Sequence, residues 1–139
     1  MPRTAFLTLA LLLAACAAER PTAAPSATTA TVGSPTLALG RFRGASGHGT
    51  AGTARIASTK DGYVLELGPD FAFDGAPDPR LGFGNDGTYD PASDIGPLRS
   101  TTGYQAYPLP ADFDPGKHGE VYVWCRKYGV PLGVAPLDG

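Results

Sequence analysis

Glycine and proline interrupt this chain so often that no long helix fits in most of it. The 139 residues include 19 glycines and 14 prolines, and from residue 37 onward no segment free of both is longer than nine residues. A typical globular helix has about 11 residues, whereas a typical strand needs only about five or six. The sequence therefore predicts an all-β domain of short strands joined by turns.

Four segments are rich in the β-branched and aromatic residues that are typical of strands. They are residues 54–57, 63–67, 121–125 and 130–134, with weaker candidates at 37–43, 81–83 and 105–109. Lys60, Asp61 and Gly62 separate the first two and favour a tight turn, so we expect a hairpin there. Short strands with such turns are typical of a single small β-sandwich or barrel-like domain.

The N-terminus predicts an exported lipoprotein. A cationic start at Arg3 precedes an apolar run at residues 5–14, and small residues lead directly to Cys16. The run is too short to span a bilayer, and a small residue before a cysteine is typical of a bacterial lipoprotein signal. We expect residues 1–15 to be removed and lipid on Cys16 to anchor the chain in a bilayer. The alternative is an ordinary secretory signal in which Cys16 is incidental, and it also predicts export.

The segment that follows is predicted to be a disordered tether. Ala, Thr, Pro and Ser fill 16 of the 20 positions from residue 17 to residue 36. Such a composition cannot bury enough apolar surface to offset its ordering entropy. We therefore divide the chain into the signal at 1–15, the lipidated cysteine and tether at 16–36, and a folded domain at 37–139, which is long enough for one core.

The net charge of the chain and the predicted signal restrict its possible binding partners and its location in the cell. The formal net charge is −2, and no large basic cluster gives the electrostatic footprint of a protein that binds nucleic acid. The lipid bilayer, reached through acylated Cys16, is the partner that the sequence predicts directly. Ala17 follows that cysteine where an aspartate would favour inner-membrane retention. We therefore expect an extracytoplasmic place in the bacterial cell envelope, on the periplasmic side of the outer membrane.

Cys125 is the second of two cysteines, and lipid on Cys16 would leave it without an intramolecular partner. Alternation along residues 121–125 places Cys125 on the same face as two valines and Trp124 on the opposite face. Two interpretations stay open. Cys125 is either a small hydrophobic core residue, or a redox thiol or ligand at the end of a strand, where Lys127 on the same face would favour the thiolate.

Several motifs together resemble one known family. Residues 121–137 contain a strand that ends in Trp-Cys, followed by an aromatic residue, a valine and a glycine; this pattern is similar to the closing signature of the DM-thirteen domain. Residues 40–56 resemble its opening, a Gly-x-Phe start and a His-Gly-x-x-Gly turn that begins at His48. Residues 65–77 and 104–110 resemble its middle and later segments. The resemblance covers nearly all of the predicted domain.

The resemblance implies a small β-sandwich-like extracytoplasmic domain for which electron transfer is the proposed activity. It places the family cysteine at Cys125, as a bare thiol or as the ligand of a group such as haem, and we take His48, Trp124 and Lys127 as neighbouring candidates. The sequence departs from the family at residues 78–82, where a proline and an arginine occupy a usually apolar run. We expect a shortened or displaced central strand there.

The residue types in the sequence give little support to a metal site. A blue-copper site needs a cysteine, two histidines and usually a weak methionine ligand, but the single methionine is Met1 of the predicted signal. We interpret His48 as a turn residue and His118 as a solvated loop residue. The Cys-x-x-Cys-His run of covalently attached haem is absent. The cofactor thus stays open between none and haem on Cys125, with copper less favoured and no metal site assigned.

Two hypotheses about function remain. The first is a thiol-based redox or electron-transfer domain centred on Cys125, with an unidentified redox or envelope protein as its partner. The second is a non-catalytic β module that binds a protein or an envelope ligand, with Cys125 a buried structural residue. The sequence favours an accessory domain over a classical enzyme in both cases.

Overall fold

A computed structural model describes residues 33–139 of the chain. The predicted signal peptide, the predicted lipidation site Cys16 and residues 17–32 lie outside the described residues. The last predicted tether residues belong to the domain surface, because the Pro35 carbonyl accepts a hydrogen bond from the Ser58 N–H at 3.0 Å. Within residues 33–139, no helix has the length and apolar character needed to cross a membrane.

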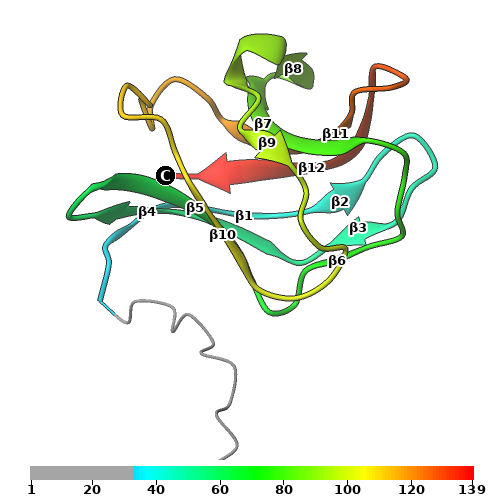
Figure 1. The fold of residues 1–139 in the computed structure, drawn as a ribbon. Coiled ribbons are helices and arrows are strands. Elements are labelled where there is room, and N and C mark those ends of the chain that lie inside the picture. The colour runs from blue at the N-terminus through cyan, green and yellow to red at the C-terminus, as the bar shows by residue number, and fades with distance from the viewer. Residues whose placement is uncertain (1–32) are drawn as a thin grey trace, which may run out of the picture. The chain divides into compact units, whose positions relative to one another are not determined.

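The described residues form twelve strands and one short 3₁₀ helix, which confirms the all-β prediction (Figure 1). The strands are β1 (Thr36–Arg41), β2 (Arg43–Gly44), β3 (Thr50–Ala51), β4 (Thr53–Thr59), β5 (Gly62–Leu67), β6 (Ala72–Phe73), β7 (Pro79–Asn85), β8 (Thr88–Asp90), β9 (Gly96–Pro97), β10 (Gln105–Pro108), β11 (Glu120–Cys125) and β12 (Val130–Asp138). The 3₁₀ helix η1 (Pro91–Ser93) follows β8. Every segment predicted as a strand lies in or overlaps one of these strands.

The main sheet is antiparallel and runs in the order β10-β5-β4-β1-β12-β11-β7-β8. Strand β12 joins its two halves, because its C-terminal end pairs with β1 and most of its length pairs with β11. The sheet curls so that the two halves face each other (Figure 1). Their inward side chains form one core, which includes Ile56 and Leu65 from one half and Phe83 and Val123 from the other.

The predicted hairpin is present. Thr59 of β4 pairs with Gly62 of β5, so Lys60 and Asp61 form a two-residue loop. Gly62 has a φ of +130°, a conformation that glycine adopts without steric cost. The local turn chemistry of the sequence therefore sets the register of these two strands.

The expectation for residues 78–82 is wrong, because β7 is neither shortened nor displaced. It has seven residues and pairs with β11 from Pro79 to Gly84. Pro79 stands first in the strand, where a missing N–H is tolerated. Arg80 is accommodated by Asp94, whose two oxygens accept hydrogen bonds from its guanidinium at 2.7 and 2.8 Å. The Arg80–Asp94 ion pair thus allows an arginine within this strand.

Side chains of β11 alternate as predicted. Cys125 lies in the core with the two valines, whereas the Trp124 ring stacks on Tyr89 at 4.4 Å between centroids. Glycine makes room for this outer aromatic layer, since a Cβ atom at Gly82 would lie 2.8 Å from the Tyr89 ring. The strand thus separates the core sulfur from the outer aromatic layer.

Candidate functional site

Cys125 occupies the last position of β11, between Pro79 of β7 and Val130 of β12. The residue is 1% exposed, and its Sγ lies 3.1 Å from the carbonyl oxygen of Pro77, to which the thiol donates. A thiol that donates a hydrogen bond retains its proton, whereas the reactive species is the thiolate. In this conformation Cys125 is therefore a packed side chain whose S–H is engaged by the Pro77 carbonyl.

The acceptor of that hydrogen bond belongs to a surface segment, residues 74–78, which we call the cover segment. Pro77 and Asp78 are both exposed, so a single layer of backbone separates the sulfur from solvent on this side. Gly75 and Asp78 have φ values of +95° and +48°, conformations that L side chains rarely adopt. The cover segment is therefore a tight surface loop and not part of the strand scaffold.

Two carboxylates attach the ends of the cover segment to the rest of the domain. At one end, Asp74 accepts from the Gly49 N–H at 2.8 Å and lies 2.9 Å from His48 Nδ1. The Gly49 N–H, followed by His48, lowers the pKa of the Asp74 carboxyl. At the other end, Asp78 lies 3.3 Å from Arg126 Nε, and its carbonyl accepts from the Arg126 N–H. These contacts attach the ends of the cover segment, and Ala76 between them packs against the core.

The three neighbouring candidates have different positions. His48 contacts the cover segment through Asp74 rather than the sulfur. Trp124 lies on the opposite face of the sheet. Lys127 follows the end of β11, where alternation no longer applies, and its ammonium lies 5.3 Å from the centroid of the Tyr128 ring. Of the three, His48 is thus the one that contacts the cover segment, and none of them makes a hydrogen bond with the Cys125 sulfur in residues 33–139.

The residues around Cys125 do not fit a haem group. Iron ligation needs an open direction at the sulfur, but Sγ is enclosed by core side chains and by the Pro77 carbonyl. Among residues 33–139, no three His, Cys, Asp or Glu side chains are placed to hold a metal ion.

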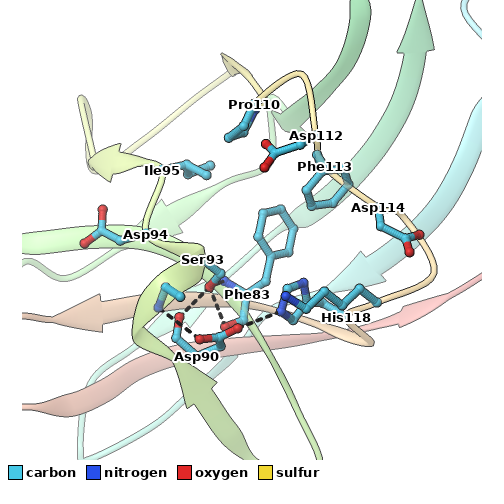
Figure 2. A pocket seen from close by; sticks show the side chains of 12 residues that line it. Phe83, Asp90, Ser93, Asp94, Ile95, Pro110, Asp112, Phe113, Asp114 and His118 are labelled. Carbon is cyan, nitrogen blue, oxygen red and sulfur yellow. Dashed lines mark hydrogen bonds and ion pairs between the residues drawn. The ribbon is translucent and has the colours of Figure 1, made fainter.

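His118 is not the solvated loop residue that the sequence predicts. Its side chain is 7% exposed, Nε2 lies 3.1 Å from Asp90 Oδ2, and the ring stacks on Phe83 with centroids 5.7 Å apart. The imidazole lines a cavity of about 130 Å³ (Figure 2). Asp90 and His118 are 28 residues apart, so no local pattern could have paired them.

The comparisons with known proteins agree with the motifs. The family model described as "Electron transfer DM13", the DM-thirteen family of the sequence analysis, matches residues 41–137. No curated protein and no solved structure matches the chain. The matched region runs from the last residue of β1 almost to the end of β12 and includes His48 and Cys125. Because the match spans more than half of the sequence, the chain belongs to the electron transfer DM13 family.

Proposed function

We propose that this protein is a lipid-anchored redox domain of the cell envelope in which Cys125 reacts as a thiol when the cover segment opens. The observation that carries the proposal is the hydrogen bond from Cys125 to Pro77. Its acceptor lies in an exposed loop, so displacement of one short segment uncovers the sulfur and removes the group that accepts the thiol hydrogen. Family membership supports the redox class, and anchoring rests on the predicted lipidation of Cys16.

The chemistry follows thiol–disulfide exchange. After opening, the Cys125 thiol loses its proton to water. The thiolate attacks a disulfide of an envelope protein, so that one S–S bond forms while another breaks and the leaving sulfur takes up a proton. The product is a mixed disulfide between Cys125 and the partner, whose other sulfur is left as a thiol. A small thiol that attacks the Cys125 sulfur then releases the partner as a dithiol, and a second small thiol frees Cys125 as the two small thiols form a disulfide.

Thiol labelling of clamp variants tests the proposal. Asp78→Asn keeps the size of the side chain but removes its charge. We therefore expect the cover segment of this variant to open more often. Its Cys125 should be labelled about fivefold faster than in wild type, which corresponds to the loss of an exposed ion pair. Asp86→Asn is the matched control, because Asp86 has a similar φ of +51° in another surface turn. Its labelling rate should equal that of wild type.

Equal rates for both variants would contradict control by the cover segment. If, in addition, no mixed disulfide forms with envelope proteins in cells, the hypothesis of a binding module with a structural Cys125 replaces the redox proposal. A Cys125→Ser strain provides the background for that trapping experiment. The anchor is tested separately, since Cys16→Ser should move the protein from the membrane fraction to the soluble fraction.

A further inference from the structure

The cavity beside His118 combines carboxylates with aromatic walls. It lies between the segment 90–95 and the loop 110–118, with the rings of Phe83 and Phe113 beside it. Figure 2 shows Asp90 and Asp112 on opposite sides of the space that these rings border. Oxygen anions next to aromatic rings favour a ligand that is cationic at one end and apolar elsewhere.

The carboxylates of this cavity are not equally available. Asp94 is neutralised by its paired hydrogen bonds to Arg80. Asp112 is exposed and makes no ion pair or hydrogen bond with any residue in 33–139. Asp90 stays ionised, because hydrogen bonds from His118 and from the Ala92 N–H lower the pKa of its carboxyl. Asp114 also lines the cavity, where its Oδ1 accepts from the Gly116 N–H at 2.8 Å, and Lys117 places one cation in the same lining. Asp90 and Asp112 are the two carboxylates that lie on opposite sides of the space between the rings (Figure 2).

An unpaired buried atom provides a second, independent indication of a ligand. Nδ1 of His118 and the Tyr89 hydroxyl are the two buried side-chain polar atoms without a partner in the described part of the chain. Nε2 lies against Asp90, so Nδ1 is left as the unpaired nitrogen of a ring that lines the cavity, and in the tautomer that carries its hydrogen on Nε2 this atom is an acceptor. Buried acceptors without a donor are rare and costly. A ligand with N–H groups would supply the missing donor.

Size and spacing argue against a metal ion. No three His, Cys, Asp or Glu side chains from residues 33–139 converge to hold a metal ion. The volume of about 130 Å³ is close to that of engineered cavities, about 150 Å³, that hold benzene. The cavity thus suits a molecule or side-chain end of about six heavy atoms.

We propose that this cavity binds a small organic cation, either an alkylammonium or a guanidinium group, between Asp90 and Asp112 against the Phe113 ring. The site does not involve Cys125 and holds whether or not the thiol is reactive. A ligand this small contributes limited binding energy, so we expect a dissociation constant of roughly millimolar size. The cation is either a free amine or an arginine or lysine side chain of another protein.

An NMR titration of the purified full chain tests the proposal. Methylguanidinium and butylammonium should shift the amide signals of Ala92, Ser93 and Phe113, whereas neutral butanol and anionic butyrate at the same concentration should leave them in place. Asp112→Asn should weaken cation binding about fivefold, the upper effect of losing one exposed ion pair. Asp86→Asn, outside the cavity, should bind as wild type does.

A further titration distinguishes a protein side chain from a free amine as the source of the cation. If the source is a protein side chain, acetyl-arginine amide should bind at least as well as methylguanidinium, and if it is a free amine the added backbone should weaken binding. Absence of saturable shifts with either cation would overturn the proposal. Equal shifts with butanol, unchanged binding by Asp112→Asn, or displacement by stoichiometric Mg²⁺ would also overturn it.

Discussion

The Cys125 region and the His118 cavity differ in their access to solvent, although both lie in one small domain. Cys125 has a chemically reactive atom without access, because core packing and the Pro77 carbonyl enclose its sulfur. The His118 cavity is open to solvent and has polar groups without a partner, but no sequence motif marks it. The strands place both sites, whereas surface segments border them: the cover segment beside the sulfur, and the loop 110–118 along the cavity.

The largest expected effect comes from Phe83, which the two regions share. Its ring is part of the core that contains Cys125 and also lines the cavity. Phe83→Ala should lower the free energy of unfolding by about 3–5 kcal/mol, as for other buried aromatic residues. Urea unfolding followed by tryptophan fluorescence measures the loss. A loss below about 1 kcal/mol would mean that the cavity wall is independent of the core.

Acid should loosen the cover segment. Because the pKa of Asp74 is lowered in the folded state, its contribution to closure is complete above its ordinary value of 3.8 and is lost as the pH falls through the lower folded value. Labelling of Cys125 by a dipyridyl disulfide, divided by the rate of the unfolded thiol at the same pH, should rise severalfold below pH 3.8. Asp74→Asn should label rapidly at every pH. A flat normalised rate in wild type would show that Asp74 does not hold the segment.

The smallest expected effect concerns the second unpaired atom. Because the Tyr89 hydroxyl has no partner, Tyr89→Phe should change the free energy of unfolding by less than about 1 kcal/mol or raise it. Tyr122→Phe is the matched comparison, since the Tyr122 hydroxyl donates to Glu120 at 2.9 Å, and it should cost about 1–2 kcal/mol. If Tyr89→Phe costs more than Tyr122→Phe, the Tyr89 hydroxyl is satisfied in solution.

The fold could be predicted from local signals. Gly and Pro spacing excluded long helices, and the Lys60–Asp61 turn defined a hairpin that the structure contains. The alternation along β11 predicted that Cys125 points inward, because the side chains of a strand have a period of two residues that can be read directly from the sequence. The error at residues 78–82 has a plain cause: the partner of Arg80 is Asp94, which only tertiary structure brings near.

The sites could be predicted only in part. A motif marked Cys125, but the Asp78–Arg126 contact beside it joins residues 48 positions apart, which leaves no periodic trace in one sequence. The aspartates at 74, 78, 90 and 94 make ion pairs or histidine contacts with residues that lie far away in the sequence, which no local pattern could indicate. For His118, composition indicated a solvated loop, whereas Phe83 and Asp90 bury it.

The denaturant dependence of Cys125 labelling tests the central claim most directly. The labelling rate gives an apparent free energy for the opening that exposes Cys125. Because opening of the cover segment exposes little surface, this free energy should fall with urea concentration at well under half the slope of global unfolding. It should also be smaller than the free energy of unfolding. Labelling with the full slope and the full unfolding free energy would show that the sulfur is reached only when the domain unfolds. That result would contradict a redox role for Cys125 in the folded protein.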